Sequence, residues 1–195
     1  MTDTNSIQLI ALSGENVGGR AEPSLMVEAE FRELYAETAR PLKSYLSRLT
    51  GNASLADELL QESYFRLLRT PLPAMDMAAR KNYLYRIATN LTRDHFRTAK
   101  HRPEPLTDSP ADAGFGRRAQ VSADLRKLMK ELSPNERAMV WLAYAEGSSH
   151  REIALVLGLK EASVRPLLHR ARRKLADLLR DCGFRPATRK RGEIE

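Results

Sequence analysis

The side chains best suited to chemistry in this 195-residue sequence are cationic and amide groups that recur at helical spacing. Residues 165–174 hold five Lys and Arg side chains and no carboxylate. A face built only for solubility usually mixes both signs of charge, whereas an unbroken basic run suits phosphates and base edges. Nucleic-acid binding is therefore the favoured interpretation, and a merely solvated face is the alternative. The candidate DNA-binding residues of this stretch are Ser163, Arg165, His169, Arg170 and Arg173.

A second basic stretch precedes it and is less specific. Its basic side chains are Arg86, Arg93, Arg97, Lys100 and Arg102. Taken alone, they fit a solvated face as well as a binding face. Aromatic and amide groups beside positive charge can stack on and hydrogen-bond to unpaired bases, and such groups stand here at Tyr83, Tyr85, Asn90 and His95. Core packing is the other interpretation of the tyrosines, and we favour it for Tyr83. The candidate DNA-binding residues here are Arg86, Asn90, Arg93 and Arg97.

The sequence offers little support for catalysis or metal binding. The four histidines show no HExxH spacing, and neither a GxSxG nor a GxxxxGK[ST] motif occurs. Glu58 and Glu62 stand one helical turn apart, as a carboxylate metal site would require, but an exposed acidic face is the better interpretation. The single cysteine, Cys182, permits no internal disulfide or thiolate cluster. We expect no catalytic residue, no metal and no cofactor.

Helices must position these side chains, because nearly every periodic stretch spaces its apolar residues by three and four. The predicted fold class is all-α, with two small helical domains joined by a flexible linker, the second containing a helix-turn-helix. The first helix is expected from Glu28 to about Leu49, with Pro41 kinking or breaking it. Ser54 is expected to cap the second helix. A third helix is expected from about Met77 to Lys100.

The start signals of the second half are sharper. Ser133-Pro134-Asn135-Glu136 and Ser149-His150-Arg151-Glu152 each predict a capping box. Gly158 can adopt the positive φ that ends the short helix, and a further helix follows. A short helix, a glycine turn and a longer helix predict a helix-turn-helix. Pro166 falls inside the recognition helix, so this helix is expected either to start late or to bend.

Charge and composition divide the chain. Residues 1–62 hold 5 basic and 10 acidic side chains, a net −5, and residues 63–195 hold 27 and 15, a net +12. A surplus of that sign suits a polyanionic partner. The predicted segments are a flexible tail at 1–27, a domain at 28–100, a Pro-rich linker at 101–121, a domain at 122–182 and a basic tail at 183–195. The longest apolar stretch is far below the roughly 20 residues that span a bilayer, so we expect a cytoplasmic protein without membrane insertion.

Two motif sets then resemble one family. Residues 58–68, ELLQESYFRLL, look like the region-two helix of extracytoplasmic-function sigma factors of the sigma-70 family, and residues 83–94, YLYRIATNLTRD, look like their W-L-Y-R-I-A-x-N-x-x-x-D motif. Residues 132–175 resemble region four, with REIA at 151–154, ASVR at 162–165 and HRAR at 169–172. The resemblance covers about residues 28–180. Tyr83 replaces a common Trp and preserves its aromatic character.

The resemblance implies a bacterial sigma factor that is not an enzyme and that binds core RNA polymerase, promoter DNA and an anti-sigma factor. It places the polymerase contacts at Glu58, Gln61, Glu62 and Phe65. The loop near 75–82 and the helix carrying Asn90, Arg93 and Arg97 would open and read the minus-ten element, and residues 163–173 would read the minus-thirty-five element. The rival interpretation is a conventional helix-turn-helix regulator that binds duplex DNA without replacing the sigma subunit.

Overall fold

The computed structural model describes residues 24–99, 128–129 and 131–182. The predicted linker, the predicted basic tail, and most of the predicted N-terminal tail lie outside these residues. The described chain is helical, as predicted, and contains α2 (Glu28–Thr50), α3 (Ala53–Arg69), α4 (Met77–Ala99), α6 (Pro134–Tyr144), α7 (His150–Leu157) and α8 (Glu161–Asp181). Within these ranges, no helix combines the length and the apolar character needed to cross a bilayer.

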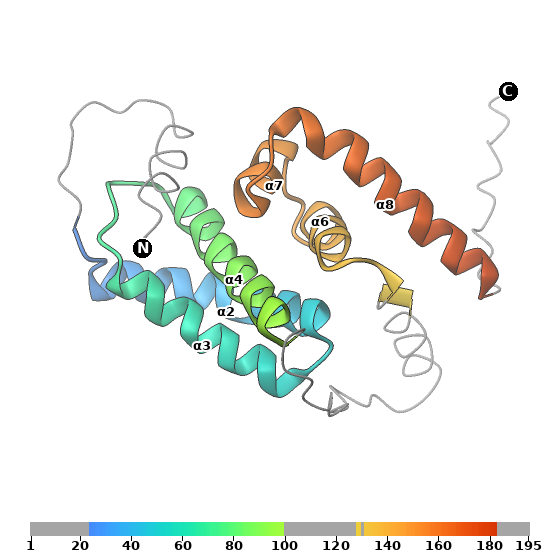
Figure 1. Ribbon diagram of the computed structural model, residues 1–195. Helices are drawn as coiled ribbons and strands as arrows, with labels where there is room; N and C mark the ends of the chain where they lie inside the picture. The colour runs from blue at the N-terminus through green and yellow to red at the C-terminus, as the bar shows by residue number, and fades with distance from the viewer. Residues whose placement is uncertain (1–23, 100–127, 130, 183–195) are drawn as a thin grey trace, which may run out of the picture.

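The helices form two units that touch each other. In the first unit, α2, α3 and α4 pack together, and in the second unit α6, α7 and α8 do the same (Figure 1). α4 lies against α7 and α2 lies against α6, so one continuous apolar core runs through both units. The fully buried side chains of the first unit include Leu34, Leu42, Tyr45, Leu67 and Leu84, and those of the second include Leu142, Ile153 and Val164.

Two buried hydroxyl pairs join the helices of the first unit. Tyr45 Oη lies 2.8 Å from Thr89 Oγ1 and so links α2 to α4. Tyr64 Oη lies 2.7 Å from Thr38 Oγ1 and links α3 to α2. Because a buried hydroxyl without a partner is costly, these pairs fix how the three helices pack.

α2 has the predicted bounds to within one residue, but Pro41 does not break it. The proline lacks only the amide that would donate to the carbonyl of Glu37, and Glu37 is exposed to water. The apolar face continues on both sides of the proline through Leu34 and Leu42, which are fully buried. Packing of that face against α3 and α4 therefore holds the helix together across the proline.

The N-cap of α3 is also earlier than predicted. Asn52, not Ser54, caps the helix, since Asn52 Oδ1 accepts the Leu55 amide at 3.2 Å. Gly51 ends α2 at φ 70°, and the Asn52 amide donates to Thr50 Oγ1 at 3.2 Å. The turn between the helices is so short that the first residue after the glycine already takes the capping position.

Residues just before α2 fasten the loop that leads into α4. Ser24 and Leu72 exchange two backbone hydrogen bonds of 3.0 Å. Arg80 of α4 pairs with Glu30 of α2, with 2.7 Å between Nη2 and Oε1. These contacts hold the start of α4 against the start of α2.

Replacing Glu30 by Gln should lower the free energy of unfolding at neutral pH by no more than about 1 kcal/mol, because the ion pair is partly exposed. The hydrogen bond from Arg80 holds the pKa of Glu30 below its ordinary value of 4.5, against the opposing effect of burial. A carboxyl group whose pKa falls on folding stabilises the protein above its unfolded pKa, and this stabilisation is lost as the pH falls through the folded pKa. Urea unfolding at about pH 7 and pH 3 should therefore show a difference between the proteins that shrinks in acid.

Glu33→Gln, an exposed change on the same helix, is the control. An equal difference at both pH values would contradict the assignment.

The caps of the second unit agree with the sequence predictions. Ser133 Oγ accepts the Glu136 amide at 3.3 Å while Glu136 Oε2 accepts the Ser133 amide at 2.8 Å. The same reciprocal pair joins Ser149 and Glu152 at 3.2 and 2.7 Å. Gly158 ends α7 at φ 66°, a conformation that L side chains rarely adopt. The helix-turn-helix is thus formed by α7, the glycine turn and α8.

Pro166 does not delay the start of α8, which begins at Glu161. The proline lies in the second turn and withholds one amide from the carbonyl of Ala162. Because Ala162 is exposed, water can satisfy that carbonyl. The buried residues Val164, Leu168 and Ala171 keep the face of α8 against the unit on both sides of the proline.

Candidate nucleic-acid interface

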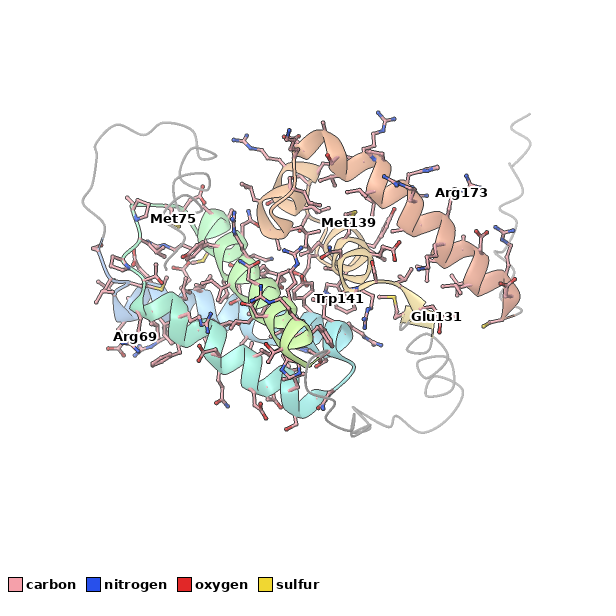
Figure 2. The ribbon with its side chains drawn as sticks, in the orientation of Figure 1. Arg69, Met75, Glu131, Met139, Trp141 and Arg173 are labelled. Carbon is pink, nitrogen blue, oxygen red and sulfur yellow. The ribbon has the colours of Figure 1, made fainter. Side chains whose placement is uncertain are left out.

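The basic run on α8 forms an exposed face. Val164, Leu168 and Ala171 point into the unit and are buried, and Leu167 packs beside them, so the polar side chains between them point outward. Of the five predicted contact residues, Ser163 is half-buried. The other four are exposed: Arg165, His169, Arg170 and Arg173. Figure 2 shows Arg173 on the side of α8 away from α6. The helix therefore offers a row of hydrogen-bond donors that no part of the described chain covers.

Two further cations of α8 serve the unit itself. Lys174 Nζ lies 3.3 Å from Glu136 Oε2, which fixes α8 to the start of α6. The guanidinium of Arg172 lies over the ring of Tyr144 at 5.8 Å from its centroid, although that ring is 60% exposed. Arg172 and Lys174 are exposed as well, but they pair within the unit, a difference that spacing along the sequence did not reveal.

The predicted face of α4 is divided into covered and exposed residues. Arg86 and Arg93 are half-buried, whereas Asn90 and Arg97 are exposed. Arg97 pairs with Asp94 on its own helix at 3.0 Å. The two half-buried arginines reach across to the second unit, where they meet backbone carbonyls of α7. In this conformation, half of the predicted reading residues of α4 face protein and half face solvent.

Tyr85 does not stand beside the basic residues as an exposed stacking group, contrary to the expectation from the sequence. It is only 2% exposed, and its ring packs on Tyr45 with 5.3 Å between centroids. Burial raises the pKa of its phenol, so the group stays neutral. Tyr83, for which core packing is predicted, is partly buried and packs against the core. The α4 face therefore carries cations and an amide without Tyr85, and His95 is exposed near the end of the helix.

An acidic and aromatic face runs along α3. Its members follow spacings of three and four, which places them on one side of the helix: Glu58, Gln61, Glu62 and Phe65. Glu58 and Gln61 are exposed, and the Phe65 ring is 53% exposed. Glu62 Oε1 accepts from Arg66 Nε at 2.6 Å, and Arg69 lies over the Phe65 ring at 5.1 Å. A large exposed ring flanked by charge is typical of a protein-binding surface.

The sequence analysis missed an aromatic cluster on α2 and α3. The Tyr35 ring lies 5.1 Å from the Tyr64 ring and 5.8 Å from the Phe31 ring. Tyr35 remains 48% exposed, so this cluster adds a second exposed ring to the unit. The signal that could have found it is the spacing of Phe31 and Tyr35, four residues apart on α2.

Other kinds of site are not apparent in the described residues. Within them, no three His, Cys, Asp or Glu side chains gather as a metal site would require. A hollow of about 210 Å³ lies between α4 and the start of α6, lined by Arg93, Phe96, Ser133, Pro134 and Asn135. Sites for small ligands usually run from about 300 to 1,000 Å³, so this hollow is small for such a ligand.

The fold and these faces define a class of protein: a helix-turn-helix DNA-binding protein with a second helical unit that carries its own basic helix and an exposed acidic and aromatic face. A comparison with protein families matches residues 34–102 to sigma-70 region 2 and residues 122–175 to sigma-70 region 4. The chain is 32% identical over 175 residues to the ECF RNA polymerase sigma factor SigL of Mycobacterium tuberculosis, covering 84% of this chain and 93% of that protein. It is 28% identical over 191 residues to BldN of Streptomyces coelicolor, covering 92% and 69%.

Solved structures share the fold. CnrH, in complex with the cytosolic domain of CnrY, superposes with a TM-score of 0.59 at 22% identity, covering 90% of this chain and 97% of that one. RpoE in complex with the anti-sigma factor NepR from Bartonella quintana gives a TM-score of 0.58 at 19% identity, covering 77% and 97%. At these identities, the similarity establishes the all-α fold.

The chain belongs to the extracytoplasmic-function sigma factors of the sigma-70 family. It is a transcription initiation factor that binds core RNA polymerase and directs initiation at specific promoters. The match to region 2 lies over the acidic helix α3 and the basic helix α4, which a conventional helix-turn-helix regulator does not need. That alternative is therefore not favoured.

Proposed function

We propose that three helix faces divide the work of initiation. The face of α3 made by Glu58, Gln61, Glu62 and Phe65 binds core RNA polymerase. The face of α4 made by Arg86, Asn90, Arg93 and Arg97, with the loop that leads into α4, opens and reads the minus-ten element. The face of α8 made by Ser163, Arg165, His169, Arg170 and Arg173 reads the minus-thirty-five element in duplex form.

One observation supports this division above the others. The inner side of α8 is buried while its basic side is exposed along the row from Arg165 to Arg173, and α8 is the second helix of a helix-turn-helix. In that motif, the second helix enters the major groove and contacts base edges and phosphates. The acidic charge of the α3 face would repel DNA, so that face suits a protein partner.

Run-off transcription with core RNA polymerase on a promoter library tests the division. Variants on the α3 face should lose polymerase binding at every promoter. Variants on the α8 face should retain polymerase binding and lose promoter recognition. If the α8 variants lost polymerase binding and the α3 variants retained it, the assignment of polymerase binding to α3 would be wrong.

The remaining parts of the proposal follow from the family. The proposed segments are region two at 28–100, a linker at 101–121 and region four at 122–182. The protein acts in the cytoplasm, uses no cofactor and catalyses no reaction of its own.

An anti-sigma factor regulates it, a proposal supported by the two related sigma factors, whose structures hold CnrY and NepR. A binding protein that blocks run-off transcription by displacing core polymerase would meet this expectation, and one that leaves it unchanged would not.

Arg173→Ala should weaken binding to all promoters alike and lower the salt slope of binding by about one unit, because a phosphate contact releases about one counterion. Arg173 is exposed at the outer side of α8, so its loss should not disturb the core. The measurement is holoenzyme affinity on several promoters across a salt series. Arg40→Ala, an exposed arginine of α2, is the matched control. A loss confined to some promoters at unchanged salt slope would instead make Arg173 a base reader.

A further inference from the structure

The first half of the loop between α3 and α4 has few backbone donors. In residues 70–73, only Thr70 and Leu72 carry an amide hydrogen, because the other two residues are prolines. The Thr70 amide donates to the Leu67 carbonyl at 3.2 Å, at the end of α3. The Leu72 amide donates outside the loop, to the Ser24 carbonyl at 3.0 Å. The chain before α2 therefore supplies the partner of the last free donor in this half of the loop.

The contact between Ser24 and Leu72 has the geometry of a minimal antiparallel sheet. Each residue donates its amide to the carbonyl of the other at 3.0 Å. Thr70 is extended, with φ −95° and ψ 117°, because a residue that precedes proline avoids the helical region. The Leu72 side chain is buried and packs in the core, whereas Ser24 is exposed. The bridge therefore joins the surface chain before α2 to an anchored point of the loop (Figure 1).

A second contact fixes the other end of the same loop. Asp76 Oδ1 accepts the Ala79 amide at 2.7 Å at the start of α4. Arg80, in the same turn, pairs with Glu30 of α2, with 2.7 Å between Nη2 and Oε1. The Arg80 side chain is only 17% exposed, so salt screens this pair less than a fully exposed one. Only residues 73–76 remain between the two contacts.

This short stretch is the part of the loop that is least covered. Ala74 and Asp76 are exposed, while Pro73 and Met75 are half-buried. Figure 2 shows Met75 at the end of the first unit where α4 begins. A segment held at both ends has fewer backbone conformations than a free loop of residues 70–76, so it loses less conformational entropy when it binds. The two contacts therefore preorganise the loop for the base contacts proposed for it.

Both contacts come from residues that lie before the matched family segment. The match to sigma-70 region 2 begins at residue 34, and Ser24 and Glu30 precede it. The loop at 70–76 and α4 lie within the match. The chain upstream of the matched segment therefore helps to fix the conformation of a surface inside it.

We propose that residues 24–30 hold the loop at 70–76 in the conformation that recognises minus-ten bases, and that Ser24 is a positioning residue for this recognition. The proposal rests on the function proposed above for α4 and for the loop that leads into it. Ser24 acts through the backbone of Leu72 and does not need to contact DNA. When the bridge is broken, more molecules have a loop conformation that fits no base well, so the preferred base loses the most affinity.

Ser24→Pro removes one hydrogen bond of the bridge and leaves the loop sequence intact. Proline lacks the amide that donates to the Leu72 carbonyl, and it tolerates an extended backbone at the edge of a sheet. Leu25→Pro is the matched control, because neighbouring residues of an extended strand direct their amides to opposite sides, so both bridge bonds remain. Both residues are exposed, and neither belongs to a proposed DNA or polymerase face. Circular dichroism and a titration with core polymerase verify that each variant keeps its fold and its polymerase binding.

The measurement is initiation by the holoenzyme on a promoter library in which the minus-ten and minus-thirty-five elements vary independently. For Ser24→Pro, the ratio of initiation between the best and the worst minus-ten base should fall by about fivefold, the change in an equilibrium expected when one backbone hydrogen bond is lost. Glu30→Gln, which weakens the second contact, should act in the same direction. Preference at the minus-thirty-five element should stay unchanged, because α8 is unaltered.

The selectivity of the loss separates positioning from a merely structural role. Lower stability alone would reduce initiation from all promoters equally, and such an equal loss in Ser24→Pro would overturn the inference. Asn90→Ala tests the function proposed for α4 in the same library. If Asn90→Ala alters the minus-ten preference and Ser24→Pro matches Leu25→Pro, the positioning role is wrong and the function of α4 stands. If none of these variants alters the minus-ten preference, the function proposed for α4 is wrong and the inference fails with it.

Discussion

Glu62→Lys should weaken binding to core RNA polymerase by about tenfold or more, since a reversed charge at a protein interface is repelled as well as unpaired. Glu62 stands between the exposed Gln61 and the exposed Phe65 on the α3 face, and its carboxylate pairs with Arg66. A lysine at this position would place two cations one turn apart on a face that is otherwise acidic. The measurement is a titration of fluorescently labelled protein with core polymerase.

The fold should tolerate this change. The Glu62 side chain is 42% exposed, and exposed substitutions usually alter the free energy of unfolding by about 0.5 kcal/mol or less. Glu37→Lys, an equal charge reversal on the exposed side of α2, is the matched control and should bind polymerase as the parent does. Unchanged affinity of Glu62→Lys would mean that α3 is not the polymerase face.

Deleting about ten residues from 103–114 should reduce initiation at the parent protein's promoters by about a hundredfold, the lower part of the advantage that linkage of two binding units provides. Residues 101–121 number 21 and can span about 70 Å when extended, and the deletion halves that reach. The two DNA-reading units could then engage only one promoter element at a time. Run-off transcription with saturating core polymerase measures the loss.

Length and not sequence should matter for this segment, which lies outside the described residues. Replacing the same ten residues by Gly and Ser preserves the number of residues, so it should retain most of the activity. The shortened protein should still bind core polymerase, because the α3 face is unchanged. Initiation at the parent rate from the shortened protein would show that the segment is only a tether.

Local signals in the sequence predicted the helices and most caps. Ser133 with Glu136 and Ser149 with Glu152 form the predicted capping boxes, and Gly158 takes the predicted positive φ. These features depend on side chains and backbone within four residues, so the local sequence is enough to predict them. Asn52 and Ser54 are both good caps, and only the tight turn after Gly51 decided between them.

The sequence analysis overestimated the effect of the two prolines on their helices, because packing between helices is not visible in a local stretch of sequence. Pro41 and Pro166 each remove one hydrogen bond, a cost that is visible in the sequence. Burial of Leu34, Leu42 and their neighbours offsets that cost, and it depends on which other helices lie alongside. Propensity is therefore overridden by packing at both positions.

The sequence by itself determined which residues are cationic, which helix faces are apolar and where the helix-turn-helix lies, because helical periodicity and caps are local properties. Only the tertiary structure decided which of those cations are available. Arg93 and Arg173 are equivalent by type and spacing, yet Arg93 is bound to the end of α7 while Arg173 is exposed. Tyr85 is likewise removed from the surface by Tyr45, which stands forty residues earlier. Contacts between segments that are distant along the chain follow from how whole helices pack, and no window of sequence contains them.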